Sequence, residues 1–297
     1  MRPLITAMRP QEWVKNVLVF AAIVFSRRFD ESGAIADVIV TFLAFCAVSS
    51  AGYLFNDLRD VDHDRRHPDK RTRPIASGAL SERTAGMASI LLALLAVALP
   101  IALVSVDVAA IVGLYAASTV LYSVVLKRLV IIDVMTIAAL FIMRVVAGSV
   151  AVGAGASEFL LVCTAMLALF LGFTKRRQEA ILEELPPAKA QPGNAALPTT
   201  RPVLEHYSLP FLDQMIAMVT ATALISYILY AVDSPFAGSK MLATAPSVLY
   251  GVFRYLYLIY DRRDTRSTAA IIAKDPGVIF AGVTYVASAL IVLYALD

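Results

Sequence analysis

Long apolar runs separated by short polar stretches recur along the whole chain. A transmembrane helix needs about 20 predominantly apolar residues, and nine runs come close to this length or exceed it. They lie at 13–27, 34–56, 85–105, 108–126, 129–152, 157–175, 211–232, 242–260 and 277–296. The pattern therefore predicts an all-α fold, a polytopic membrane bundle of about nine transmembrane helices in a single intramembrane domain over residues 1–297.

The composition agrees with a membrane protein and excludes an ordinary soluble domain. The mean hydropathy is +0.73, 59% of the residues are hydrophobic and only 16% are charged. Cys46 and Cys163 both fall within predicted spans, so we expect neither a disulfide nor a metal site from them. The first residues, MRPLITAMRPQEW, lack the apolar segment and cleavage site of a signal peptide, so none is expected.

The basic residues set the predicted orientation. Most of the 26 Lys and Arg fall before the first span or after the second, fourth, sixth and eighth, which places them on one side of the membrane. Because cytoplasmic loops carry the excess of Lys and Arg, we expect the N-terminus in the cytoplasm and the C-terminus outside. The charge-rich loops at about 57–84, 176–210 and 261–276 then all face the cytoplasm.

Three acids in the first of these loops are spaced like one face of a helix. If the second span continues as a helix past Phe55, Asp57, Asp60 and Asp64 point within about 60° of one another over two turns. Unpaired like charges at these spacings destabilise a helix. Carboxylate oxygens are ligands of hard divalent ions, and Mg²⁺ is usually bound through one or two carboxylates plus substrate phosphates. The spacing therefore predicts a Mg²⁺ site.

Cationic side chains follow the three acids directly. Arg65, Arg66, Lys70, Arg71 and Arg73 form a basic loop suited to phosphate oxygens, so the whole stretch has the layout expected for a Mg²⁺–diphosphate. Two other interpretations stay open. The cations could pair with the acids for structural reasons, or they could serve membrane topology alone. Topology leaves the accompanying acids unexplained, because acids contribute little to orientation.

A second polar cluster ends the sixth predicted span. On a continuing helix, Lys175, Arg176, Glu179 and Glu183 share one face about 100° wide. This mixture of cations and carboxylates could hold the far side of the same metal–diphosphate. A solvated helix with Lys–Glu pairs four residues apart is the alternative.

Charged residues inside predicted spans are costly, so they indicate function unless they pair. Asp133 and Arg144 lie eleven residues apart in the fifth span, which places them on one face. We expect them to meet a polar cavity or partners on other helices, for which Asp213 and Arg254 are candidates. A purely structural pair between helices is the alternative.

The first predicted span opens with RPQEWVKN. Trp13 is typical of an anchor at the membrane interface. Lys15 and Asn16 follow at the predicted cytoplasmic boundary, where Lys15 could extend toward the headgroups or contribute to an anion site.

Several segments resemble the UbiA-type intramembrane prenyltransferase superfamily. The stretch NDLRDVDHD (56–64) matches its N-D-x-x-D-x-x-x-D signature, and nine helices with charged cytoplasmic loops match its architecture. Within the superfamily, the chain is most similar to the decaprenyl-phosphate phosphoribosyltransferases. The segments that carry this similarity are MRPQEWVKN (8–16), YLFNDLRDVDHDRRHPDKRTRPIASG (53–78), FIMRVVAG (141–148), KRRQE (175–179) and YSLPFLD (207–213).

The resemblance implies a Mg²⁺-dependent enzyme of the bacterial inner (plasma) membrane with its active site facing the cytoplasm. It would transfer the 5-phosphoribosyl group from 5-phosphoribosyl 1-diphosphate to a polyprenyl phosphate such as decaprenyl phosphate, releasing pyrophosphate. A ribosyl lipid of this kind suits cell-wall pentose assembly. We expect no nucleic acid as a partner.

The family pattern also assigns roles to individual residues. Asp57, Asp60 and Asp64 would bind the metal, and Glu179 would join them as a catalytic residue. The expected substrate-binding residues are Lys15, Asn16, Asn56, Lys70, Arg71, Arg73, Arg144, Lys175 and Arg176. Where other members carry a second D-x-x-x-D motif, this chain has KRRQEAILE (175–183). That departure favours a phosphorylated sugar donor.

Two other functions stay open. The first is transfer of a polyprenyl group from its diphosphate to an aromatic acceptor, which would use the same acidic helix. The second is a transporter or channel lined by Asp133 and Arg144. The extracytoplasmic halves of the predicted spans are almost uniformly apolar, which disfavours a polar pathway across the membrane.

Overall fold

The computed structural model describes residues 2–25, 31–66, 70–184, 202–232, 238–261, 271–272 and 274–294, and every regular element in these ranges is a helix. The all-α prediction is confirmed. The chain divides into two compact units. Met1–Ala156 belong to the first, and the helices from Glu158 to Tyr294 belong to the second.

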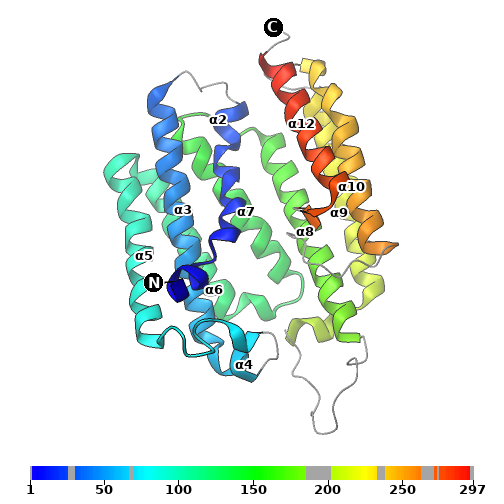
Figure 1. Cartoon of the computed structure of the whole chain (residues 1–297). Helices are drawn as coiled ribbons and strands as arrows, with labels where there is room; N and C mark the ends of the chain where they lie inside the picture. Colours follow the sequence, from blue (N-terminus) through cyan, green and yellow to red (C-terminus); the bar gives the residue numbers. More distant parts are fainter. Residues whose placement is uncertain are drawn as a thin grey trace. The chain divides into compact units, whose positions relative to one another are not determined.

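The first unit is a bundle of four long helices with shorter ones at its ends. Its elements are α1 (Arg2–Met8), the 3₁₀ helix η1 (Pro10–Phe20), α2 (Ala21–Phe25), α3 (Ser32–Arg59), α4 (Val61–Arg66), η3 (Lys70–Thr72), α5 (Glu82–Leu103), α6 (Val106–Val124), η4 (Leu126–Arg128) and α7 (Ile132–Ala151). Helix α3 contacts α5, α6, α7 and η1. Figure 1 shows α5 alongside α3, and α4 at the C-terminal end of α3.

Parts of the surface of the first unit are apolar, like its core. Phe45, Val48 and Val112 are fully buried between the helices, whereas Met87 and Leu94 on α5 are each 65% exposed. A row of exposed large apolar side chains on one helix is unfavourable in water and favourable in a bilayer. These outward faces therefore identify α5 as a lipid-facing helix of an integral membrane protein.

Eight helices in the described part of the chain are long and apolar enough to cross a membrane. They correspond to the second through ninth predicted spans. The first predicted span, 13–27, has a different structure as far as it is described, to Phe25, because Pro10–Phe20 form a 3₁₀ helix and Ala21–Phe25 are α-helical. Runs of 3₁₀ helix longer than 3–4 residues are uncommon, so tertiary packing must hold this one.

The packing that holds η1 is a close approach to α7. A Cβ atom added to Gly148 of α7 would lie 1.9 Å from the carbonyl oxygen of Val19 in η1. Only glycine leaves room for the two backbones at this distance. The contact fixes η1 against α7. The polar residues Lys15 and Asn16 of η1 are fixed with it.

The second unit is a bundle of four long helices. Its elements are α8 (Glu158–Glu184), η5 (Pro202–His206), α9 (Leu209–Val232), η6 (Gly238–Thr244), α10 (Ala245–Tyr260) and α12 (Pro276–Tyr294). Helix α8 packs on α9, and α10 packs on α12. Asp275 caps α12 by accepting bonds from the amides of Gly277 and Val278, and Arg254 of α10 donates to both of its carboxylate oxygens.

Candidate active site

The acidic motif lies at the junction of α3 and α4. Helix α3 ends at Arg59, and Asp60 leaves the helical region with φ −93° and ψ 8°. The amide of Asp60 still donates to the Asn56 carbonyl, and that of Asp64 donates to the Asp60 carbonyl, so α4 follows α3 almost without a break. The expectation of one continuous helix past Phe55 was wrong at this single residue.

Asp57 and Asp64 are buried and share a cation. The Nη1 atom of Arg73 lies 3.0 Å from Oδ1 of Asp57 and 2.7 Å from Oδ2 of Asp64. The Nη2 atom of Arg9 lies 2.7 Å and 2.9 Å from the two oxygens of Asp57. Two of the three acids therefore converge as the helical spacing predicted.

Asp60 has a separate partner. Lys127 of η4 donates to both oxygens of Asp60 at 2.9 and 3.1 Å, and its Nζ is 3.5 Å from Oδ1 of Asn56. Arg59 binds the carbonyl oxygens of Ser123 and Val124. The end of α3 is thus tied to the connection between α6 and α7, which supplies a cation to Asp60 other than the one shared by Asp57 and Asp64.

The segments that supply Arg9 and Lys127 each contain a residue with positive φ. Arg9 has φ 56° and ψ 61°, and Ile131, just after η4, has φ 69° and ψ −47°. Positive φ is rare for residues other than glycine, and it persists where the surrounding structure enforces it, often at functional sites. In both places the strained residue lies at or near a cation that binds the acidic motif.

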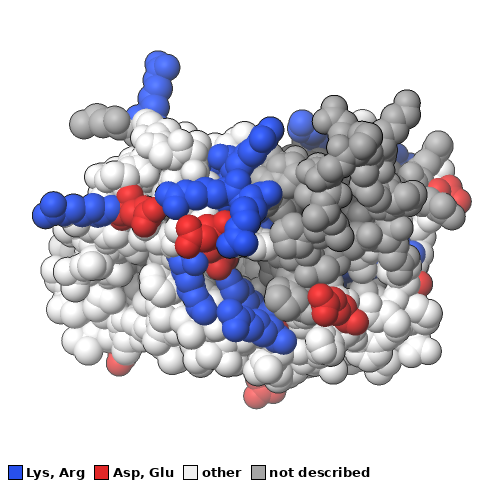
Figure 2. Space-filling view, turned by 90° about the horizontal axis from the view of Figure 1, so that it is seen from below, with Lys and Arg blue, Asp and Glu red and all other residues white. Residues whose placement is uncertain are grey.

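The basic loop lies at the same end of the first unit. Lys70 and Arg71 belong to η3, where Lys70 is half-buried and Arg71 is exposed. Seen from the α4 end, Lys and Arg side chains gather around Asp and Glu side chains on this face (Figure 2). Residues 67–69 of the predicted loop lie outside the described residues.

The acidic cluster has the donor chemistry for Mg²⁺, although no three Asp, Glu, His or Cys side chains in the described part of the chain surround one point. Asp57 and Asp64 already converge on one positively charged nitrogen, that of Arg73. Two carboxylates are enough for Mg²⁺, which usually takes its remaining ligands from water and substrate phosphates. The residues present therefore fit the ion.

Arg144 lies in a buried polar cluster in the first unit. Its guanidinium donates to Oδ1 of Asn16, to the Leu140 carbonyl and to the hydroxyl of Tyr115, at 2.6–2.8 Å. Asn16 is fully buried, and its amide also contacts the sulfur of Cys46. All of these acceptors are neutral, so the cluster holds a buried positive charge in a membrane-spanning helix, an arrangement typical of functional sites.

The structure also places two other polar residues of the first unit. Lys15 pairs with Glu12 one turn earlier in η1. Asp133 is fully buried at the start of α7. The partners proposed for Asp133 and Arg144 bond elsewhere: Asp213 binds Arg177, and Arg254 binds Asp275.

The second unit contains the other predicted cluster at the C-terminal end of α8. Arg176 is fully buried and pairs with Glu179, while Lys175 is exposed. The side chain of Glu183 lies outside the described residues. Arg177 donates to Asp213 at 2.6 Å, and its guanidinium lies 4.1 Å from the centre of the Tyr260 ring, whose hydroxyl also donates to Asp213.

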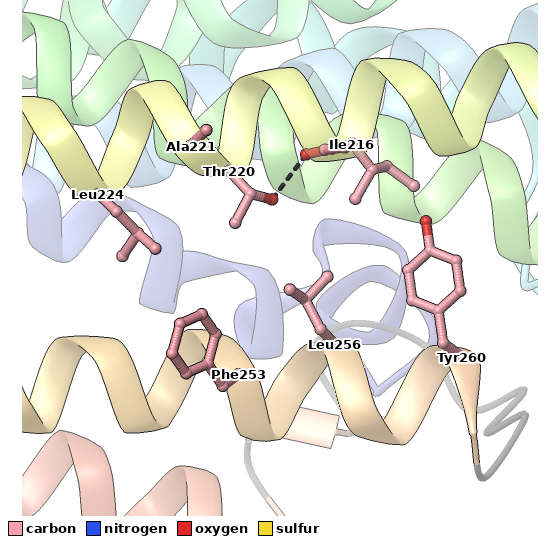
Figure 3. Close-up of a pocket in the computed structure, with 8 residues that line it drawn as sticks. Ile216, Thr220, Ala221, Leu224, Phe253, Leu256 and Tyr260 are labelled. Atoms are coloured by element: carbon pink, nitrogen blue, oxygen red, sulfur yellow. Dashed lines mark hydrogen bonds between the residues drawn. The ribbon is translucent and has the colours of Figure 1, made fainter.

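An apolar pocket of about 370 Å³ lies between α9 and α10 of the second unit. Figure 3 shows side chains from both helices pointing into it, with Leu224 and Phe253 toward one end and Tyr260 at the other. The hydroxyl of Thr220 bonds its own helix at the Ile216 carbonyl, so it does not make the wall polar. The pocket is suited to a hydrocarbon chain.

Sequence reasoning missed Arg9 and Lys127 as members of the site. Lys127 was counted only as a charge that sets the orientation, and Arg9 as such a charge and as part of the segment MRPQEWVKN, with no role at the site. A signal was present, because Arg9 and Lys127 fall on the same predicted side of the membrane as the acidic motif. The pairing of Arg9 with Asp57 and of Lys127 with Asp60 depends on long-range packing, which no local sequence pattern predicts.

The comparisons with known proteins agree with this geometry. The model of the UbiA prenyltransferase family matches residues 17–274. The decaprenyl-phosphate phosphoribosyltransferase of Corynebacterium glutamicum is 37% identical over 241 residues, which cover 77% of this chain and 67% of that protein. The enzyme of the same name from Mycolicibacterium smegmatis is 34% identical over 244 residues, covering 80% of this chain and 73% of that protein.

Solved structures resemble the chain over its whole length. A UbiA homologue from Archaeoglobus fulgidus bound to DMAPP and Mg²⁺ has a TM-score of 0.72 at 18% identity, covering 99% of both chains. The same homologue bound to GPP and Mg²⁺ has a TM-score of 0.74, also at 18% identity, covering 98% of this chain and 99% of that one. At this level of identity the likeness shows the fold.

Proposed function

The chain belongs to the UbiA prenyltransferase family and is a membrane transferase of that type, and from this premise we propose that it is a polyprenyl-phosphate phosphoribosyltransferase. It takes the 5-phosphoribosyl group from 5-phosphoribosyl 1-diphosphate and transfers it to a polyprenyl phosphate, releasing pyrophosphate. The observation that carries the proposal is the buried pair Asp57 and Asp64, converging on one cation among several arginine and lysine side chains. The similarity to two decaprenyl-phosphate phosphoribosyltransferases supports this donor and acceptor.

The reaction exchanges one bond at C1 of the ribose. The bond from C1 to the diphosphate oxygen breaks, and its electron pair leaves with pyrophosphate. An oxygen of the lipid phosphate forms the new bond to C1. Because that oxygen is already anionic, no strong general base is needed, and alignment of the two substrates is the main task of the protein.

The acidic motif and the basic side chains share the handling of charge. Asp57, Asp64 and Asp60 would hold Mg²⁺, which when bound neutralises charge on the departing pyrophosphate. Arg73, Lys70 and Arg71 would bind phosphate oxygens. Asn56 would bind the Mg²⁺–diphosphate beside Asp60. Positive charge develops at C1 as the bond breaks, so the nearby carboxylates also favour that step.

Other predicted residues keep their proposed roles in this scheme. Arg144, with Asn16, would attract the acceptor phosphate to the first unit, and Lys15 would contribute at the interface. Lys175, Arg176 and Glu179 are proposed to bind the phosphorylated donor. The site would face the cytoplasm of a bacterial plasma membrane, where a water-soluble donor can meet a lipid acceptor.

The pocket between α9 and α10 would hold part of the polyprenyl chain. It is apolar and lies between two membrane-spanning helices. Its volume of about 370 Å³ suits a few isoprene units. Ligand pockets are commonly about 300–1,000 Å³. A longer lipid would extend from the pocket into the bilayer.

The proposal is tested by turnover of the purified protein in detergent. Donor labelled with ¹⁴C in the ribose is mixed with a long polyprenyl phosphate and Mg²⁺, and label in the lipid phase is measured. We expect transfer by the wild type, loss with a chelator, recovery with added Mg²⁺, and a fall of at least about 100-fold in Asp57→Asn and Asp64→Asn.

Asp62→Asn is the matched control for these variants. Asp62 lies in α4, its side chain is 79% exposed, and it pairs with Arg65 rather than with the acidic cluster. It should keep wild-type activity. If a polyprenyl diphosphate and an aromatic acceptor react instead while no ribose label moves, the donor assignment is wrong. If neither reaction occurs, the enzyme assignment is refuted.

A further inference from the structure

Two guanidinium nitrogens contact the carboxylates that are proposed to bind the divalent cation. Nη2 of Arg9 donates to both carboxylate oxygens of Asp57, at 2.7 and 2.9 Å. Nη1 of Arg73 donates to both acids, at 3.0 Å from Asp57 and 2.7 Å from Asp64. Mg²⁺ binds oxygen at about 2.0–2.1 Å, so an ion bound to both acids on the side where Nη1 of Arg73 lies would displace that guanidinium, and an ion bound on the side of Nη2 of Arg9 would displace the other.

Burial indicates which partners move. The side chains of Asp57 and Asp64 are each 3% exposed, whereas those of Arg9 and Arg73 are 25% and 28% exposed. The acids are fixed by helices α3 and α4. The arginine side chains are long and about a quarter exposed, so they can swing outward while the acids stay in place.

Charge balance links this movement to the substrate. Asp57 and Asp64 carry two negative charges, and Arg9 and Arg73 carry two positive ones. A divalent cation entering alone would neutralise the two acids and leave the two guanidiniums without anionic partners. A diphosphate arriving with the cation supplies new anionic oxygens, and guanidinium groups match phosphate oxygens in geometry and charge.

We propose that Arg9 and Arg73 are exchangeable counter-ions, which leave Asp57 and Asp64 for the oxygens of the diphosphate when the metal and the diphosphate bind together. Arg9 thereby becomes a substrate-binding residue, and metal and diphosphate bind with positive coupling. The inference rests on the proposed diphosphate donor but not on what the donor carries or which acceptor it meets.

Neutral and conservative variants separate exchange from simpler roles. Arg9→Asn removes the charge and suits the backbone, because asparagine tolerates positive φ better than most residues. Arg73→Gln removes the charge of the second arginine. Arg9→Lys and Arg73→Lys keep the charge but lose the planar, forked guanidinium. Arg83→Gln, at an exposed position near the start of α5, is the control for loss of one positive charge.

Two binding measurements on the full chain in detergent follow the exchange. The first is the affinity for Mn²⁺ alone, from the electron paramagnetic resonance signal of the free ion. The second is the affinity for ³²P-labelled inorganic pyrophosphate in excess Mg²⁺, from equilibrium dialysis. Neither needs turnover, so both report on the site independently of activity.

The expected result is a change of opposite sign in the two affinities. Arg9→Asn and Arg73→Gln should bind Mn²⁺ alone about fivefold more tightly or better, and Mg²⁺–pyrophosphate about tenfold more weakly, within the usual range of coupling between sites. The lysine variants should shift both affinities in the same directions by less. Arg83→Gln should leave both unchanged.

Several outcomes would overturn the inference. If both affinities fall, the arginines brace the acids and do not exchange. If only the Mn²⁺ affinity rises, they compete with the metal without binding phosphate. If the lysine variants match the wild type while the neutral variants differ, bulk charge explains the effect. If the Mn²⁺ and Mg²⁺–pyrophosphate affinities shift in opposite directions but the protein transfers no ribose, the proposed function is refuted and this inference is supported.

Discussion

Replacing Gly148 by alanine tests the packing that positions the polar cluster around Arg144. An added Cβ would lie 1.9 Å from the Val19 carbonyl oxygen, and real Cβ contacts under 3.0 Å are essentially never seen, so η1 must move by at least about 1.1 Å. Asn16 lies one 3₁₀ turn before Val19 in η1 and accepts a 2.8 Å bond from Arg144. A shift of this size would stretch or break that bond.

The expected cost is worked from two opposing effects. Overpacking against a rigid backbone costs about 3 kcal/mol at the upper end of its usual range. Alanine is a better helix former than glycine by about 1 kcal/mol. We therefore expect Gly148→Ala to lower the free energy of unfolding by about 2 kcal/mol.

Gly113→Ala is the matched control for this change. Gly113 is also within a helix of the first unit, and a Cβ there would meet nothing within 4 Å. This variant should gain the helix-forming benefit of about 1 kcal/mol and keep its activity. The assay is thermal unfolding in detergent followed by circular dichroism, with turnover measured on the same samples. Equal midpoints and equal activities for the two variants would refute the close approach of η1 and α7.

Four further predictions follow from other contacts. Lys127→Met and Asp60→Asn should each lower kcat/KM for the donor about tenfold, and the double variant should lose little more, because coupled residues of one ion pair are not additive; additive losses would show that the pair is not shared. Arg144→Lys should lose most activity, since a compact ammonium group lacks the planar guanidinium fork that reaches three separate acceptors. Turnover at the wild-type level would contradict the role of Arg144. Phe253→Trp should narrow the α9–α10 pocket and raise KM for a long polyprenyl phosphate more than for a short one, and an equal effect on both would exclude the pocket as a chain site. The hydrogen bond from Arg254 lowers the pKa of Asp275 below its ordinary value of about 4, so stability from this pair is present above that value and is lost as the pH falls below it; thermal midpoints measured across that range should fall in the wild type and stay flatter in Asp275→Asn.

The sequence predicted the helical class and the approximate limits of eight spans, because apolar length alone decides which segments can cross a bilayer. It could not predict that Pro10–Phe20 form a 3₁₀ helix. Hydropathy measures how apolar a segment is and not whether its amides bond three or four residues back. The decisive contact, Gly148 against Val19, joins residues far apart in the chain.

The acidic site shows the same division between local and long-range information. The spacing of Asp57 and Asp64 was enough to bring them together, because one face of a helix is a local property. Asp60 differs because Lys127 draws it to the α6–α7 connection, which is a tertiary contact. The role of Arg9 at the site was not predicted, because it depends on a left-handed backbone conformation that the surrounding sequence does not predict.

The central claim is tested most directly by following both halves of a doubly labelled donor. 5-Phosphoribosyl 1-diphosphate carries ¹⁴C in the ribose and ³²P in the terminal phosphate of its diphosphate group, and it is incubated with the protein, Mg²⁺ and a polyprenyl phosphate. The account predicts ¹⁴C in the lipid phase and an equal amount of ³²P released as water-soluble pyrophosphate. Finding both labels in the lipid phase would contradict it. So would finding that the protein binds the donor but moves neither label.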